Sequence, residues 1–403
     1  MTSAAPALLD TPPTDAGSTP RLWRRAGGLR GVAAAFVVVA ALRCAQLVAV
    51  WVMAPPDSPK TLWQRLLLWD GGWLINVAVE GYPSGYTYRD GEITGNGFAF
   101  FPLFPLLVRG GTALGLPPDA ASLLVANVAA LAAGVLVYLL GVSVWSRRVG
   151  YALVVLVCAQ PMAVVLSMGY TESLFLALVA GALLAAHERV WWAAGLAGLG
   201  AALTRPTGAA VGVALAVAAL ALWWQARRGR VVPGRFELPS AFAAAALALA
   251  GVPAFLAWVG WRVGEWDAWF TVQTKGWGTT FDFGASVLDF AGSAVLGGQD
   301  VVEVGTVLLL VVAVLLAGYA AGERVWPPLL AYGLIALVLV VGQAGYWHSK
   351  PRLLVPVLLL CCVPLARGLA RVSTGTSVVL LMMWSAFGLW FGAHMITVWP
   401  YTI

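Results

Sequence analysis

Residues 31–53 read GVAAAFVVVAALRCAQLVAVWVM, an apolar run with a single charged residue, Arg43. A helix of this length is long enough to cross the hydrocarbon core of a bilayer. Arg24, Arg25 and Arg30 precede it, and such arginines favour the cytoplasmic side. The run is too long for the core of a signal peptide and lacks a clear cleavage site. It therefore predicts an uncleaved anchor helix with a cytoplasmic N-terminus.

The composition extends this interpretation to the whole chain. Of 403 residues, 61% are hydrophobic and only 10% are charged, whereas soluble domains are about 25% charged. We expect a disordered cytoplasmic tail over 1–30 and one transmembrane domain over 31–403, with the lipid bilayer as its partner. The net charge of +6 reflects arginines in cytoplasmic loops, so no nucleic-acid partner is expected.

Eleven apolar runs have spanning or near-spanning length, which predicts an all-α polytopic membrane protein. They lie at about 31–53, 119–141, 150–167, 171–187, 190–204, 206–225, 238–262, 301–321, 327–343, 353–370 and 376–396.

One further stretch, 101–116, decides how the loops are oriented. It is short, opens with Pro102 and Pro105, and contains Arg109. If it does not span, the arginines of the short loops fall on the cytoplasmic side with the N-terminal ones. These are Arg147, Arg148, Arg189, Arg227, Arg228, Arg230, Arg235, Arg324, Arg367 and Arg371. If it spans, the cluster at 227–235 is exported, against the positive-inside rule. We therefore predict an interfacial helix on the outer leaflet.

This orientation gathers polar segments at one outer surface. The first extracytoplasmic loop covers 54–118 and includes interfacial helices, and the second large loop covers 263–300. Residues 169–173, 204–206 and 346–352 join them on the same face. Polar elements that converge at one membrane surface predict a site. We expect an integral protein of the plasma membrane with an extracytoplasmic active site.

The first outer loop contains the most distinctive patterns. It reads LWDGGW at 68–73, AVEGYP at 78–83 and GFAFFPLFP at 97–105. Asp70 directly follows a predicted interfacial helix at 60–69, and two glycines after it permit close approach of a ligand. Asp70 is either the N-cap of the next helix, a position that Asp favours, or a functional carboxylate.

Together these patterns resemble the PIG-V family, which comprises mannosyltransferases of GPI-anchor assembly and their bacterial relatives. The resemblance is strongest over 68–105 and continues through YTES at 170–173 and ALTRPTG at 202–208. It implies a GT-C-like bundle and a polyprenyl-phosphate sugar donor. Eukaryotic members usually carry His-Phe where this chain has Trp73-Leu74, so a histidine base at this position is excluded and GPI assembly is not implied.

GT-C chemistry then suggests roles for individual residues. The reaction would invert the anomeric carbon, with Asp70 as the general base that accepts the hydroxyl proton. Trp69 belongs to the same motif. The leaving phosphate needs positive charge, and the candidates are Arg205, Lys275, Lys350 and Arg352, with His348 as a hydrogen-bond donor. Arg352 follows Pro351 at the start of an apolar helix, where backbone N–H groups also favour an anion.

Several of these residues also have a simpler interpretation. Glu172 either interacts favourably with the dipole of the helix it begins or orients substrate hydroxyls or a metal. The functional interpretation is favoured, because a carboxylate at a membrane boundary is costly without a partner. Lys275 is either a solvated loop lysine or a phosphate ligand. Trp269 and Trp277, with their neighbour Trp266, either stack on a sugar, line a prenyl groove or anchor the protein at the interface. Arg43 either pairs with a buried acid or reaches backbone carbonyls.

The sequence and the resemblance together predict a mannosyltransferase that uses a polyprenyl-phosphate-mannose donor and an extracytoplasmic glycan, glycolipid or glycoprotein acceptor. The resemblance implies no cofactor besides the donor substrate and leaves a divalent metal open. The alternatives are a transporter or flippase of lipid-linked sugars, which would need the same cations, and a non-catalytic scaffold of the cell envelope.

Overall fold

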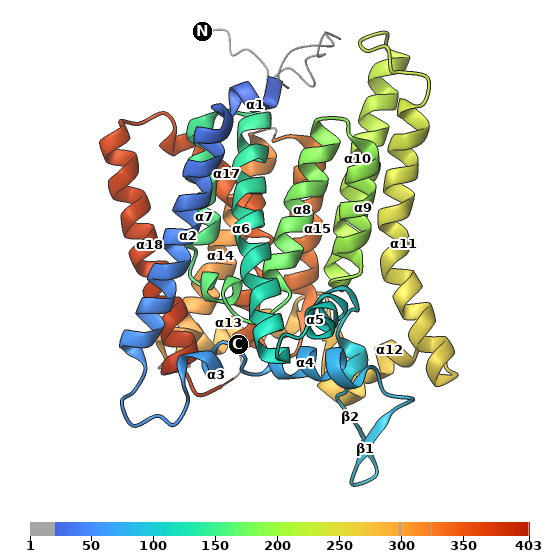
Figure 1. Ribbon diagram of the computed structural model, residues 1–403, viewed down its shortest axis with the longest axis vertical. Coiled ribbons are helices and arrows are strands. Elements are labelled where there is room, and N and C mark those ends of the chain that lie inside the picture. Colours follow the sequence, from blue (N-terminus) through green and yellow to red (C-terminus); the bar gives the residue numbers. More distant parts are fainter. Residues whose placement is uncertain (1–20, 298–299, 324, 402) are drawn as a thin grey trace.

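The computed structural model describes residues 21–297, 300–323, 325–401 and 403. Its helices stand side by side in one bundle, with α1 (Arg21–Arg25) at one end and the C-terminus at the other (Figure 1). The chain is about 75% helical and forms no closed sheet in this described part. The predicted all-α membrane architecture is therefore confirmed.

Six helices of the described chain are long and apolar enough to cross a membrane. They are α2 (Gly28–Met53), α6 (Pro118–Val144), Pro206–Arg227 (η3, Pro206–Gly208, with α10, Ala209–Arg227), α11 (Glu237–Val263), α14 (Val301–Gly322) and α18 (Thr374–Thr397). A seventh span results if the bent pair Trp347–Leu353 and Leu358–Leu369, which meet at 56°, counts as one.

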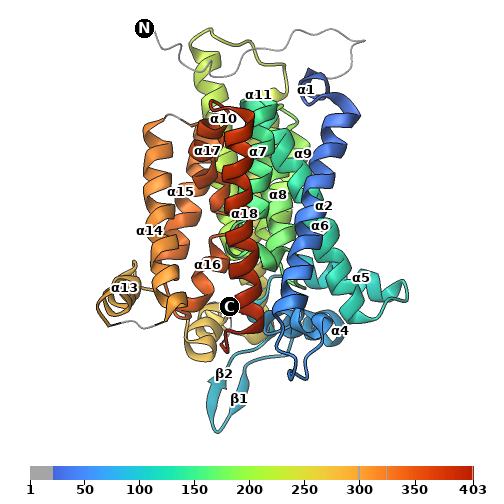
Figure 2. The ribbon, with the colours of Figure 1, turned by 90° about the vertical axis from the view of Figure 1, so that its left-hand side faces the viewer.

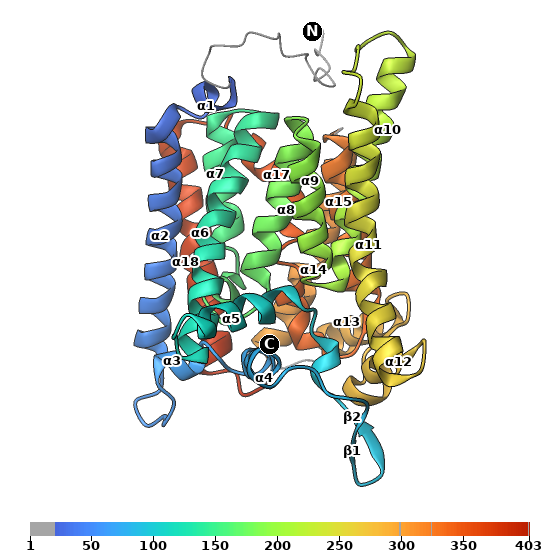
Figure 3. The same cartoon turned by 45° about the vertical axis from the view of Figure 1, so that its right-hand side comes forward.

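Four further helices lie parallel to the long ones but are shorter (Figures 1 and 3). They are α7 (Arg147–Cys158), α8 (Glu172–His187), α9 (Trp191–Ala202) and α15 (Pro327–Gly342). Each of the eleven predicted runs contains a helix, but these four have only 12 to 16 residues. At 1.5 Å per residue they rise about 18–24 Å, less than the roughly 30 Å of a bilayer core.

The end of the bundle away from α1 is closed by short elements. Figure 3 shows α5 (Leu103–Ala113) lying across the bundle there rather than along it. Its 11 residues rise about 16 Å, too little to span, so the stretch 101–116 does not invert the later helices. The other helical elements at this end are α3 (Leu62–Arg65), α4 (Asp70–Glu80), η1 (Gly97–Ala99), α12 (Ala268–Thr271), η4 (Val272–Gly276), α13 (Ala285–Gly297), η5 (Trp347–Ser349) and α16 (Lys350–Leu353).

Two small antiparallel strand pairs lie at the same end. Strands β1 (Thr87–Arg89) and β2 (Glu92–Thr94) form a hairpin that projects from the bundle (Figure 2). Asp90 and Gly91 both have positive φ, as a tight two-residue hairpin turn requires. Strands β3 (Thr280–Phe281) and β4 (Gln343–Ala344) pair across a long sequence separation. This second pair ties the 263–300 segment to the chain that precedes α16.

The ends of the bundle differ in charge. The turns at the α1 end carry Arg147, Arg148, Arg189, Arg227, Arg228, Arg230, Arg235, Arg367 and Arg371, while Arg324 lies outside the described residues. The opposite end carries most of the acidic residues. This one-sided distribution is the one that the sequence predicts, and the side of the membrane that each end faces stays a prediction.

Arg43 stabilises a break in the helix of one predicted span. The run 150–167 is not one helix, because α7 ends at Cys158 and a 3-10 turn, η2 (Ala163–Leu166), follows. Carbonyls at a helix end lose their partners inside the helix, which is costly away from water. The buried Arg43 guanidinium donates to the carbonyls of Cys158 and Ala163. Of the two alternatives for Arg43, backbone carbonyls are therefore the observed partners.

Part of the predicted disordered tail over 1–30 is helical. Residues 1–20 of this segment lie outside the described residues. From Arg21 onward the chain is already helical in α1, and α2 begins at Gly28. A tail over 1–30 is therefore wrong for its last ten residues. Arg147 holds this segment by donating to the carbonyls of Arg24 and Arg25 at 3.1 and 2.6 Å.

Candidate functional site

A cavity of about 800 Å³ opens at the end of the bundle away from α1. It forms where three short helices stop: residues just before α8, just after α9 and at the end of α15 all line it. The remaining walls come from α4, the chain before α5, η4 and α16. The short helices therefore leave a space inside the bundle that a set of full-length spans would fill.

Asp70 is held on the cavity wall by a strained turn. It is the first residue of α4, and Trp69 before it has φ 53° and ψ −110°, a region that costs a non-glycine residue about 1–3 kcal/mol. Trp69 occupies the N-cap position, and α4 has no side-chain cap hydrogen bond. Asp70 thus does not act as the cap. Both Trp69 and Asp70 line the cavity.

The segment before α8 stabilises this turn. The Gly169 N–H donates to the Leu66 carbonyl at 2.9 Å, and the Tyr170 hydroxyl donates to the Leu68 carbonyl at 3.0 Å. A Cβ on Gly169 would lie 2.5 Å from the Ser122 hydroxyl oxygen, so a larger residue here would have to displace neighbouring side chains. The YTES and LWDGGW motifs, about a hundred residues apart, are therefore parts of one structural unit.

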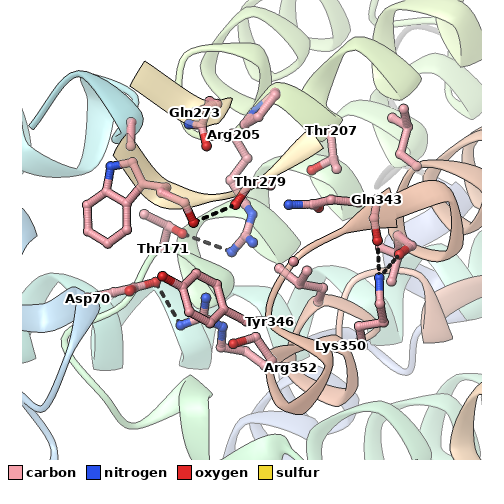
Figure 4. A pocket seen from close by; sticks show the side chains of 18 of the residues that line it. Asp70, Thr171, Arg205, Thr207, Gln273, Thr279, Gln343, Tyr346, Lys350 and Arg352 are labelled. Atoms are coloured by element: carbon pink, nitrogen blue, oxygen red, sulfur yellow. Dashed lines mark hydrogen bonds and ion pairs between the residues drawn. The ribbon is translucent and has the colours of Figure 1, made fainter. Parts of the chain in front are cut away.

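Two arginines and two carboxylates alternate beside the cavity. Arg352 Nη1 lies 2.7 Å from Asp70 Oδ2, and Arg352 Nε lies 3.4 Å from Glu172 Oε1. Arg205 Nη1 lies 2.6 Å from the same Glu172 oxygen and donates to the Thr171 hydroxyl at 3.0 Å. Figure 4 shows Asp70, Arg205 and Arg352 around one space. The row balances two positive against two negative charges, which buried ions require.

Glu172 is the buried centre of this row. Its side chain is only 1% exposed, and it does not line the cavity. An unpaired carboxylate there would be very costly, so its two guanidinium partners are what makes its burial possible. Glu172 therefore orients Arg205 and Arg352, and this arrangement gives no support to direct contact with a substrate hydroxyl.

Pro206 restricts the backbone conformation of Arg205. The residue before a proline is driven toward extended backbone, and Arg205, before Pro206, has φ −153° and ψ 150°. The chain therefore leaves α9 and turns into η3 at this residue. The Leu103 N–H donates to the Leu203 carbonyl at 2.9 Å, which fixes the start of α5 to the same junction. Arg205 itself lines the cavity.

Lys350 and Arg352 lie in a short helix that is not the predicted one. The apolar run 353–370 is broken: α16 covers Lys350–Leu353, and α17 begins at Leu358 after a stretch that contains Pro356. A proline removes one helix hydrogen bond, and the Tyr332 hydroxyl donates to the Pro356 carbonyl at 3.2 Å. With four residues, α16 is shorter than the predicted helix, and the backbone contribution to anion binding beside Arg352 stays a prediction.

The Lys350 ammonium is buried at the edge of the cavity. It donates to the Val340 carbonyl at 2.9 Å and to the Gln343 carbonyl, at the end of α15. A cation at a helix C-terminus is favourable, and Figure 4 shows Lys350 and Gln343 beside the same space as the arginines. Lys350 therefore both caps α15 and adds a third cation to the lining.

Two predicted ligands lie elsewhere. Lys275 is exposed on η4 and is not among the residues that line the cavity. His348 is not among them either, and its ring contacts the rings of Tyr346, Trp347 and Tyr401. Positive charge suggested Lys275 and hydrogen-bond donation suggested His348, but neighbouring residues line the cavity in their place.

The tyrosines of the first loop are structural. The Tyr82 hydroxyl donates to the Phe100 carbonyl at 2.7 Å, and the Tyr86 hydroxyl donates to Glu265 at 2.7 Å. Burial raises the pKa of Tyr82, and burial together with Glu265 raises the pKa of Tyr86 to about 12. Tyr88 is exposed on β1. None of the three lines the cavity.

Sequence analysis assigned no role to several residues that line the cavity. They are Trp73, Phe100, Gln273, Thr279, Gln343 and Tyr346. Only Trp73 could have been found, because it lies three residues after Asp70 on α4 and shares its helix face. The described residues contain no group of three or more His, Cys, Asp or Glu side chains that could hold a metal ion.

Comparison with solved structures relates this architecture to known proteins. ArnT from Cupriavidus metallidurans in the apo state matches with a TM-score of 0.50 and 15% identity, over 89% of this chain and 63% of ArnT. ArnT bound to undecaprenyl phosphate matches with a TM-score of 0.51 and 16% identity, over 89% and 64%. The chain has a GT-C fold. It spans less than two thirds of the length of ArnT.

One further solved structure matches with a lower TM-score. The apo oligosaccharyltransferase of Archaeoglobus fulgidus matches with a TM-score of 0.46 and 15% identity, over 91% of this chain and 56% of that one. No family model and no curated protein matches the sequence. The resemblance to the PIG-V family therefore stays a prediction.

Proposed function

We propose that this protein is a membrane mannosyltransferase that transfers mannose from a polyprenyl-phosphate-mannose donor to an extracytoplasmic acceptor. One observation carries the proposal. Among the described residues, the side chains that line the cavity include three cations, Arg205, Lys350 and Arg352, and one carboxylate, Asp70. Cations suit a phosphate leaving group, and a lone carboxylate suits a proton acceptor. The choice of mannose rests on the motif resemblance.

The reaction is a single displacement. The acceptor oxygen forms a bond to the anomeric carbon while its proton passes to the Asp70 carboxylate. The bond between the anomeric carbon and the phosphate oxygen breaks, and its electron pair leaves with the lipid phosphate. Attack from the face opposite the phosphate inverts the anomeric carbon. Asp70 and the cations line one cavity, which supports base and leaving-group stabiliser acting together.

Donor binding frees Asp70 for this role. Without substrate, Arg352 Nη1 lies 2.7 Å from Asp70 Oδ2, so the base is occupied by a guanidinium. A donor phosphate competes for the same N–H groups, because guanidinium binds phosphate and carboxylate with similar geometry. Glu172 keeps Arg352 and Arg205 in position during this exchange. The acceptor hydroxyl then replaces Arg352 as the partner of Asp70.

The charge distribution supports an extracytoplasmic site. The arginine-rich turns lie at the α1 end, and the cavity lies at the other end. Short cytoplasmic loops are enriched in arginine. The plasma membrane is the expected location, with the α1 end in the cytoplasm.

Purified protein in proteoliposomes tests the function against its alternatives. The vesicles contain mannose-labelled polyprenyl-phosphate-mannose and receive a membrane extract as the source of acceptor. A mannosyltransferase gives a new labelled product and releases polyprenyl phosphate. Movement of the intact donor across the bilayer without product would instead indicate a flippase. Neither product nor donor movement, with the label unchanged, would indicate a scaffold and overturn the proposal.

A further inference from the structure

The cavity has two unlike walls, and the proposed function uses only one of them. The cations lie on the α9, α15 and α16 side. The aromatic part of the lining comes from α4 and from the residues that directly follow η1 and η4. Three rings on it, Trp73, Phe100 and Trp277, contact one another and are called the aromatic triad below.

The aromatic triad is a rigid platform. The Trp73 and Phe100 rings stack with their centroids 6.3 Å apart and an interplanar angle of 15°. The Trp277 ring meets both edge-on, at 5.3 Å from Trp73 and 5.8 Å from Phe100, the arrangement that aromatic pairs favour. A Cβ on Gly95 would lie 2.6 Å from the Trp277 ring. Glycine at this position therefore lets the backbone press against Trp277 and hold it.

Trp73 presents an open face beside the base. It is 36% exposed although its ring is stacked on one neighbour. Three residues separate it from Asp70 on α4, so both side chains lie on the same helix face. Trp63 on α3, at the same end of the bundle, is 47% exposed and does not line the cavity. Exposure toward the cavity distinguishes Trp73 from such a surface tryptophan.

Polar side chains are interleaved with the triad. Gln273, Thr274 and Thr279 line the same part of the cavity. An amide offers both donors and acceptors, and each hydroxyl can do either. The Thr274 and Thr279 hydroxyls donate to backbone carbonyls and keep acceptor capacity. A prenyl chain would leave the Gln273 amide unpaired, which costs free energy in a closed site. A pyranose ring matches both features, since its C–H face is apolar and its hydroxyls project from the rim.

We infer that the acceptor is a carbohydrate, and that the sugar ring carrying the attacking hydroxyl stacks on the aromatic triad. This inference rests on the proposed function and adds the acceptor class to it. Stacking on Trp73 points a rim hydroxyl toward Asp70, while the donor phosphate occupies the cation side. The two substrates thus meet between two walls of different chemistry.

Binding of simple glycosides tests the inference without requiring transfer. The protein is held in lipid nanodiscs free of sugar-based detergent. Saturation-transfer NMR measures the binding of methyl α-mannopyranoside, and glycerol, a polyol without a ring, serves for comparison. We expect the wild-type protein to bind the glycoside and not glycerol. Trp73→Ala should weaken glycoside binding by roughly two- to tenfold, the loss of one aromatic contact. Trp73→Phe should retain most of it, and the control Trp63→Ala should be unchanged.

The outcomes separate this inference from the proposed function. Binding of the donor lipid should be the same in Trp73→Ala and in the wild-type protein, because the cation wall is intact. Glycoside binding without any mannosyl transfer would overturn the proposed function and retain the carbohydrate site. No glycoside binding by the wild-type protein, equal binding by Trp73→Ala, or equal binding of glycerol would overturn the inference.

Discussion

Arg43 and Arg352 are both buried beside a broken helix, yet their guanidinium groups have different partners. Arg43 donates to the backbone carbonyls of Cys158 and Ala163. Arg352 lies 2.7 Å from the Asp70 carboxylate and lines the cavity. Arg43 compensates carbonyls that the helix break leaves without partners. Arg352 instead pairs with a side chain that faces an open space.

The difference shows how a buried membrane charge can be assigned a role. Burial alone does not separate a structural from a functional arginine, since both are costly without partners. The partners of the guanidinium group do separate the two roles. Backbone carbonyls at a fixed break cannot move away, so Arg43 is permanently occupied. A carboxylate on a cavity wall can exchange Arg352 for a ligand, so Arg352 is available to an anion.

Labelling of each end of the bundle from outside the cell gives an all-or-none test of the side of the membrane on which the cavity beside Arg352 opens. Single cysteines replace Tyr88 on the hairpin or Trp266 after α11, both highly exposed, in a background without native cysteines. Both should react with an impermeant thiol reagent in intact cells. A cysteine at Val232, which is 92% exposed in the turn between α10 and α11, should react only after permeabilisation. Labelling at 232 with protection at 88 would invert the topology.

Substitution of Arg352 should impair donor use. Arg352→Ala removes a charge-assisted contact to phosphate, worth about 1.5–3 kcal/mol, so the donor KM or Kd should rise roughly ten- to a hundredfold. Arg352→Lys should rescue only partly, because an ammonium lacks the planar fork. Arg109→Ala, on the exposed surface of α5, is the charge-matched control. Unchanged donor kinetics in a folded Arg352→Ala protein would remove this residue from the site.

Substitution of Arg43 should lower stability and leave turnover almost unchanged. Arg43→Met keeps an apolar stem but leaves the Cys158 and Ala163 carbonyls unpaired, at a cost of about 1–3 kcal/mol each. We expect a lower melting temperature in nanodiscs and a turnover per folded molecule close to the wild-type value. A loss of turnover without a loss of stability would mean that Arg43, too, acts on the substrate.

The sequence predicts the bundle well because its main physical signal is local. Each membrane-spanning run is apolar over its whole length, so composition alone reveals the run at 301–321 or at 31–53. Breaks within a run are not visible in this way. Pro161 and Pro356 lie in the two breaks, and a proline can either kink or end a helix. The carbonyls of Cys158 and Pro356 are paired by Arg43 and Tyr332, which are distant in sequence.

The site was only partly predictable for the same reason. The motif resemblance singled out Asp70, which lines the cavity together with three cations. The need for positive charge at the leaving phosphate suggested these cations, Arg205, Lys350 and Arg352. It also suggested Lys275, whose side chain turns outward on η4. The direction of a loop side chain depends on tertiary contacts that a single sequence does not display. Glu172 was found, but its position behind the arginines was not.

Asp70→Asn in the purified enzyme tests the central claim most directly. The substitution preserves side-chain shape and removes proton-accepting ability, and Asp57→Asn, an exposed residue of the same loop, is the control. We predict that mannosyl transfer falls about 10²–10⁴-fold, while the protein still folds and binds the donor lipid, since Arg352 loses its competing carboxylate. Asp57→Asn should transfer normally. Near-normal transfer by Asp70→Asn would contradict the account.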